Sequence, residues 1–204
     1  GSTSYNLYYP VQVDPIPGDY PTIRMFIQHV FGTAEVEVES RGMKTKVPRW
    51  IMGMDYIQII YQKPLERLPI LCLVNKQRNT GKSTFLEFMR MMLGDNATIV
   101  GNEDLEDGFN SSFVSKLVIG VDEGFIDKKK VIEKLKHMAT TKTMKLHSKG
   151  KDKSEIDFFG KFILTSNDES NFVNVDAEEI RFWVLKVPQF TKENPDLVDD
   201  MAAE

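Results

Sequence analysis

The chain has 204 residues, of which 41% are hydrophobic and 27% are charged. This length and balance fit one packed globular domain and exclude a disordered segment. No apolar run approaches the roughly 18 residues of a membrane helix, and the N-terminus carries no secretory signal pattern. The single cysteine, Cys72, excludes an internal disulfide framework and predicts a reducing compartment.

Charge is distributed unevenly along the chain. The net charge is −4, yet the segment 128–153 holds ten lysines against two acidic residues, so it carries +8 and the remainder carries −12. A basic block inside an acidic protein indicates a local site for an anionic partner.

Apolar spacing predicts two helices in the first third of the chain. Residues 5–20 are rich in proline, tyrosine and aspartate and indicate an extended lead-in. A helix is expected from Pro21 until Gly32, and a second from Arg49 to Gln62.

Short unbroken apolar runs then predict strands that are buried on both faces. These runs cover residues 69–74, 117–121, 162–165 and 182–187. Helical patterns at 82–93 and 129–138 separate them. The alternation predicts an α/β fold with three layers around a central, mostly parallel sheet, preceded by a small helical segment.

The first buried run leads into a segment with the pattern of a phosphate-binding loop. Strand, loop and helix follow one another, and Gly81, Lys82 and Ser83 match the second half of G-x-x-x-x-G-K-[ST]. Lys76 occupies the place of the first glycine. The alternative is a chance match in a turn before a helix. The predicted nucleotide-binding residues are Asn79, Thr80, Gly81, Lys82, Ser83 and Thr84.

Polar residues follow the later buried runs as well. Asp122 and Glu123 end the second, where a magnesium-holding Asp and a water-activating Glu are expected. Asn167 follows the third apolar run and could contact a γ-phosphate, although an Asx turn would also explain an asparagine at this position. Arg181 precedes the fourth, and its plain alternative is a surface arginine paired with a nearby glutamate.

Residues 144–158 predict a β-hairpin with a basic tip, because two alternating segments flank a lysine-rich turn. Lysines at such a tip would contact phosphates of a nucleic acid without reading its sequence. The candidate DNA-binding residues are Lys145, His147, Lys149, Lys151 and Lys153. A zinc site is not expected, since the sequence has no Cys/His cluster.

The order of these motifs resembles that of the superfamily 3 helicases. Those proteins are AAA+ ATPases of papillomavirus, parvovirus, phage and plasmid replication, and the similarity covers about residues 47–190. The Leu164-Thr-Ser-Asn167 segment is the most distinctive part of the match.

The resemblance implies an AAA+ P-loop NTPase that hydrolyses ATP with Mg²⁺ as a DNA helicase or translocase. Lys82 and Ser83 would bind the nucleotide and Mg²⁺, Asp122 the metal, and Glu123 would act as general base. Asn167 would be the sensor and Arg181 an arginine finger for a neighbouring subunit. The implied partners are single-stranded DNA and further copies in a hexameric ring, in the cytoplasm of a bacterial or phage-infected cell.

The same interpretation divides the chain into three parts. These are an N-terminal lead-in and helical segment at 1–46, an ATPase core at 47–190 and a C-terminal tail at 191–204. Gly1-Ser2 has the appearance of a tag remnant, and the sequence as a whole that of a fragment.

Two other functions fit part of the pattern. A P-loop kinase for a small metabolite would need the loop but neither the hairpin nor the Thr-Ser-Asn strand end. The other is a nucleotide-switched assembly or DNA-binding module that hydrolyses slowly, and the Asp122-Glu123 pair argues against it.

Overall fold

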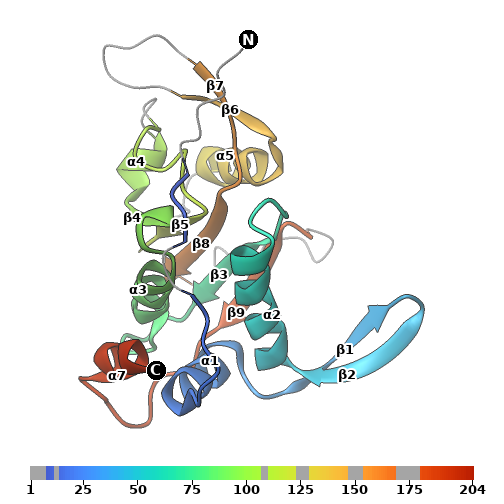
Figure 1. The fold of residues 1–204 in the computed structure, drawn as a ribbon, viewed down its shortest axis with the longest axis vertical. Coiled ribbons are helices and arrows are strands. Elements are labelled where there is room, and N and C mark those ends of the chain that lie inside the picture. The colour runs from blue at the N-terminus through green and yellow to red at the C-terminus, as the bar shows by residue number, and fades with distance from the viewer. Residues whose placement is uncertain (1–7, 12–13, 107–109, 123–128, 147–153, 169–179) are drawn as a thin grey trace.

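The computed structural model describes residues 8–11, 14–106, 110–122, 129–146, 154–168 and 180–204. A five-stranded sheet lies at its centre, in the order β4-β5-β8-β3-β9, and every pairing in it is parallel (Figure 1). The strands are β3 (Ile70–Val74), β4 (Ala97–Val100), β5 (Val118–Val121), β8 (Lys161–Ser166) and β9 (Phe182–Lys186). The predicted α/β fold with a parallel central sheet is confirmed.

Strand β3 divides its side chains between two hydrophobic cores. Leu71 and Leu73 join the core that includes residues of α1 (Pro21–Phe31), α2 (Arg49–Gln62), α3 (Lys82–Leu93) and α7 (Leu197–Ala203). Ile70, Cys72 and Val74 face the opposite core, which includes residues of α5 (Lys129–Thr140). Successive strand residues point to opposite faces, so the unbroken apolar run reflects helices that cover both sides of the sheet.

Four helices coincide with the predicted ones. They are α1 (Pro21–Phe31), α2 (Arg49–Gln62), α3 (Lys82–Leu93) and α5 (Lys129–Thr140). Three shorter elements were not predicted, because each is too short to show a helical period. They are the 3₁₀ turn η1 (Gly94–Asn96), α4 (Asn102–Glu106) and α7 (Leu197–Ala203).

Two antiparallel hairpins extend from the body. The first pairs β1 (Glu35–Ser40) with β2 (Met43–Pro48) and projects away from the sheet (Figure 1). It was not predicted, although Arg41 and Gly42 both adopt positive φ, as a tight hairpin turn requires. The second pairs β6 (Thr143–Leu146) with β7 (Ser154–Asp157), which confirms the predicted hairpin, while its tip lies outside the described residues.

The C-terminal residues fasten α7 to the start of α1. Tyr20 offers no side-chain cap to α1. Instead, the Glu204 carboxylate accepts hydrogen bonds from the backbone N–H groups of Thr22 (2.8 Å) and Ile23 (3.0 Å). A carboxylate at a helix N-terminus satisfies otherwise unpaired donors and opposes the helix dipole. Residues 191–204 thus contain a packed helix, and the 46/47 division falls within β2; the three-part division itself remains a prediction.

Helices α1 and α2 approach closely at Gly53. A Cβ atom built there would lie 2.4–2.7 Å from the ring carbons of Phe31, which is fully buried. This contact fixes how α2 packs on α1, and α1 in turn reaches the loop that follows β3.

We expect Gly53→Ala to destabilise the fold by about 1–3 kcal/mol through overpacking, although alanine is the better helix former. Urea unfolding would measure the loss. Gln58→Ala, at an exposed position of the same helix, serves as the control and should change stability by less than about 0.5 kcal/mol. If Gly53→Ala cost as much in a Phe31→Leu background as in the wild type, the ring contact would not be the cause.

Candidate functional site

Three neighbouring strands end at one edge of the sheet and carry the candidate site. β8 lies between β5 and β3, so the residues after all three strands meet there. They line a pocket of about 360 Å³. Its lining residues are Arg78, Asn79, Thr80, Gly81, Lys82, Ser83, Thr84, Asp122, Thr165, Ser166 and Asn167.

The loop after β3 forms its opening turn without a glycine. The Asn75 side chain is buried, accepts a hydrogen bond from the Gln77 N–H at 2.7 Å, and donates to the Val187 carbonyl at 2.7 Å. Among the described residues, positive φ occurs in this loop only at Asn79 and Gly81. Lys76 therefore occupies a conformation open to any L-residue, and its place in the motif needs no glycine.

The segment after β9 holds the rest of the loop. The Phe190 N–H donates to the Asn79 carbonyl at 3.1 Å, and the Asn79 amide donates to Glu193 at 2.8 Å. The Phe190 ring covers Gly81 so closely that a Cβ there would lie 2.9 Å from it. These contacts keep Asn79 and Gly81 in their left-handed conformations.

His29 of α1 completes this support. Its Nε2 lies 3.0 Å from the Thr80 carbonyl, and its ring stacks on Phe190 with centroids 3.9 Å apart and planes 7° from parallel. Burial lowers the pKa of His29, against the opposing effect of the Thr80 and Pro188 carbonyls. The imidazole thus connects α1, the loop and the segment after β9.

Lys82 is enclosed by its own loop. The residue is buried, and its ammonium donates to the carbonyls of Asn75 (3.1 Å) and Gln77 (3.3 Å) and to the Thr80 hydroxyl (3.0 Å). It stands at the first turn of α3, whose backbone N–H groups and dipole favour an anion. A bound phosphate could replace these neutral acceptors as the hydrogen-bond partner of the Lys82 ammonium, because a charged acceptor forms the stronger hydrogen bond.

Asp122 joins three elements around the pocket. One carboxylate oxygen, Oδ1, accepts hydrogen bonds from the Ser83 hydroxyl at 3.0 Å and from the Thr165 hydroxyl. A carboxylate beside hydroxyl oxygens is the kind of donor set that Mg²⁺ prefers. Thr165 was missed from the sequence because it lies within an apolar strand pattern. A polar residue just before the end of such a run is the signal that could have identified it.

The structure brings most of the predicted nucleotide site together. Asn79, Thr80, Gly81, Lys82, Ser83, Thr84, Asp122 and Asn167 all line the one pocket. Arg181 does not join them, because its carbonyl accepts from the Ile70 N–H at 2.7 Å, at the opposite edge of the sheet. Glu123 lies outside the described residues. The roles assigned to these residues remain predictions.

The candidate DNA-binding residues fall on the β6–β7 hairpin. Lys145 is exposed on β6, and its carbonyl accepts a hydrogen bond from Asn110 at 2.8 Å. His147, Lys149, Lys151 and Lys153 lie outside the described residues.

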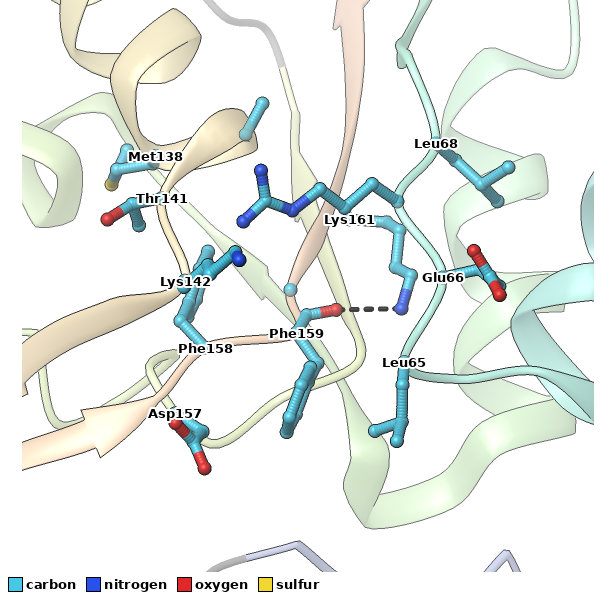
Figure 2. Close-up of a pocket in the computed structure, with 13 residues that line it drawn as sticks. Leu65, Glu66, Leu68, Met138, Thr141, Lys142, Asp157, Phe158, Phe159 and Lys161 are labelled. Atoms are coloured by element: carbon cyan, nitrogen blue, oxygen red, sulfur yellow. Dashed lines mark hydrogen bonds between the residues drawn. The ribbon is translucent and has the colours of Figure 1, made fainter.

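A second pocket, of about 300 Å³, lies near the base of this hairpin (Figure 2). Leu65 and Leu68 line one side of it, and Lys142 and Phe158 line the other. Lys161 is buried between them and donates hydrogen bonds to the carbonyls of Phe159 (2.8 Å) and Pro64. Burial lowers the pKa of Lys161 to about 8, against the opposing charge of Glu66.

The family of this chain follows from a match to a protein-family model. Residues 73–181, more than half of the chain, match the family described as "Family of unknown function (DUF5906)". The chain belongs to this family.

This DUF5906 chain is similar to one curated protein and to solved structures of an NrS-1 C-terminal region. It is 26% identical, over 149 residues, to the DNA primase-polymerase of Nitratiruptor phage NrS-1, covering 70% of this chain and 20% of that protein. It also resembles the apo structures of the NrS-1 C-terminal region, residues 305–718. One has a TM-score of 0.75 at 18% identity and covers 96% of this chain and 46% of that one. Another has a TM-score of 0.72 at 17% identity and covers 95% and 44%. The chain thus spans about a fifth of the curated relative.

These findings correct the resemblance drawn from the motifs. The identification as a superfamily 3 helicase is wrong, since the matching family is DUF5906 and the named relative is a primase-polymerase. The predicted ATP-driven helicase or translocase, the kinase and the slowly hydrolysing switch are contradicted with it. The assignment to the AAA+ P-loop class and the hexameric ring are not supported either. The physical reason is that a strand–loop–helix with an acidic neighbour specifies phosphate-binding geometry and does not specify a reaction.

Two kinds of feature are absent from the part of the chain that the structure describes. Within it, no group of three or more His, Cys, Asp or Glu side chains is arranged to hold a metal ion. None of its helices has the length and apolar character needed to cross a bilayer.

The buried Lys161 predicts a pH dependence of stability. Its folded pKa of about 8 lies below its ordinary value of 10.5, so between these values the unfolded state binds more protons and stability should rise with pH. Relative to Lys161→Met, the free energy of unfolding of the wild type should increase from pH 8 to 10 by up to about 1.4 kcal/mol per pH unit. Denaturant titrations would measure it.

Lys142→Met, an exposed lysine of the same pocket, is the control for removing a positive charge there. Equal slopes for the wild type and Lys161→Met would contradict the assignment to Lys161.

Proposed function

We propose that this chain is a nucleotide-binding domain of a DNA replication enzyme of the primase-polymerase kind. It holds the triphosphate of a Mg²⁺-bound nucleoside triphosphate on the loop between β3 and α3. The observation that carries the proposal is the convergence of Lys82, Ser83 and Asp122 in one pocket. The replication context rests on the primase-polymerase relative.

Each part of a Mg²⁺–triphosphate has a counterpart in the pocket. Lys82 supplies the positive charge, and the N–H groups at the start of α3 supply donors to phosphate oxygens. Ser83 and Asp122 supply oxygen ligands to the metal, with Thr165 orienting the carboxylate. Asn167 lines the pocket, and its proposed role is to contact the terminal phosphate.

The proposed role is binding rather than bond formation. Nucleotidyl transfer joins a 3′-hydroxyl to the α-phosphorus, releases pyrophosphate, and commonly uses two metal ions held by several carboxylates. Among the described residues, the pocket offers the single carboxylate of Asp122, and Glu123 follows it in the sequence. We therefore assign nucleotide capture to this domain and the chemical step to another part of the full-length enzyme.

Single-stranded DNA is the proposed partner of the β6–β7 hairpin. The antiparallel pairing of Thr143–Leu146 with Ser154–Asp157 supports a projecting ribbon, and the sequence between these strands carries Lys149, Lys151 and Lys153. Because the relative comes from a phage, we place this activity in the cytoplasm of a bacterial cell.

Lys82→Ala should weaken Mg²⁺-dependent binding of a nucleoside triphosphate by about a hundredfold, the effect of removing hydrogen bonds between a buried charge and phosphate. Asp122→Asn should weaken it mainly in the presence of Mg²⁺, because it removes a metal ligand. Calorimetric titration with and without EDTA would measure both. Lys116→Ala, a lysine outside the pocket, is the matched control. Unchanged affinity of a folded Lys82→Ala protein would refute the site.

Neutralising Lys149, Lys151 and Lys153 together should weaken single-stranded DNA binding equally for every sequence tested, since phosphate contacts carry no base information. It should also reduce the log–log salt slope by about 0.7 for each phosphate that the variant no longer neutralises. Fluorescence anisotropy at several salt concentrations would measure both. Neutralising Lys128, Lys129 and Lys130 is the control. An equal effect in the control would attribute the result to overall charge instead of the hairpin.

A further inference from the structure

Resting on the proposed nucleotide site, we infer that a large cavity beside the loop holds the nucleoside part of the ligand and accepts any of the four bases. The cavity has a volume of about 1110 Å³ and is bounded by α1, by the loop and by residues 188–198. Its size exceeds that of a ribose with a purine base, and sites for small ligands commonly occupy such concave, partly apolar spaces.

The cavity continues from the phosphate pocket. Asn79 and Thr84 line both, so a ligand whose phosphates lie against Lys82 passes these two residues to enter the larger space. The described residues that line the phosphate pocket are polar apart from Gly81, so they offer no apolar wall suited to a base. The nucleoside is thereby directed towards α1.

The walls of the cavity offer apolar and aromatic surface at positions fixed by the fold. Phe190 and His29 form a stacked pair that is held to the loop by the Thr80 and Asn79 carbonyls. Met25 and Val198 stand on the rim, 45% and 39% exposed. Contact with such side chains favours a flat base without depending on which base it is.

Discrimination between bases requires polar groups that are free to form hydrogen bonds with one base edge. Three side-chain amides around the cavity already donate hydrogen bonds within the protein. Asn79 donates to Glu193 (2.8 Å), Gln189 to the Arg78 carbonyl (3.3 Å) and Asn194 to Asp200 (2.9 Å). A base edge would have to displace these internal bonds to be read. Thr191 and Lys192 also line the cavity, so they are further polar side chains through which a base edge could be read. With the three amides engaged, the expected result is weak selection among the bases.

Titrations with Mg²⁺-tripolyphosphate and with the Mg²⁺ complexes of ATP, GTP, CTP and UTP test the inference. The nucleotides should bind at least about tenfold more tightly than tripolyphosphate and within about fivefold of one another. Met25→Trp and Val198→Trp, which fill the cavity from its exposed rim, should remove that advantage and leave tripolyphosphate binding unchanged. Met43→Trp, at an exposed methionine of β2, is the matched control and should change neither.

The outcomes separate this inference from the proposed function. Tripolyphosphate binding that is absent, or that survives Lys82→Ala, would refute the phosphate site itself. Lys82-dependent tripolyphosphate binding with no effect of Met25→Trp or Val198→Trp on the nucleotides would refute the cavity alone. A preference above about fivefold for one base would overturn the claim of broad acceptance.

Discussion

The parallel pairing of β8 between β5 and β3 is the constraint on which the site depends. Parallel strands direct their carboxyl ends to a common edge, and ligands of open α/β sheets bind there. Thr165 of β8 lies within hydrogen-bonding reach of Asp122, which follows the neighbouring strand β5. Ser83, at the start of the helix that follows β3, donates to the same carboxylate. One oxygen atom thus receives donors from two elements that are remote in sequence.

The loop depends on a second constraint, which the motif does not contain. Left-handed backbone at Asn79 is unfavourable unless neighbouring groups stabilise it. Phe190 and His29 supply those neighbours from segments more than a hundred residues apart in the chain. The buried Asn75 side chain stabilises the opening turn of the loop by accepting a hydrogen bond from the Gln77 N–H. A loop with an incomplete glycine pattern is therefore kept in shape by tertiary contacts.

The sequence predicted the parts of the fold that have a strong period. The strand at 70–74 and the helices at 49–62 and 82–93 were predictable because burial imposes a regular apolar pattern on them. Helix α7 and the β1–β2 hairpin were not, since the first is too short and the second is mostly exposed and carries charges on both strands.

The site was predicted where residues lie together in sequence and missed where folding brings them together. Lys82 and Ser83 belong to a local motif, and Asp122 follows a recognisable buried strand. Thr165, His29 and Phe190 gain their roles only from contacts with distant segments. The family assignment failed for a related reason: the motifs indicate where phosphate can bind, and many reactions begin with that step.

The position of Glu204 bears on how much chain this fold requires. The family match ends at residue 181, yet the chain continues through Phe190 over the loop to a carboxylate that caps α1. Helix α1 and residues 188–198 are far apart in the sequence, yet both line the cavity beside the loop. The packed structure is accordingly wider than residues 73–181, and a piece limited to them would retain Lys82 and Asp122 while losing His29 and Phe190, which contact the loop.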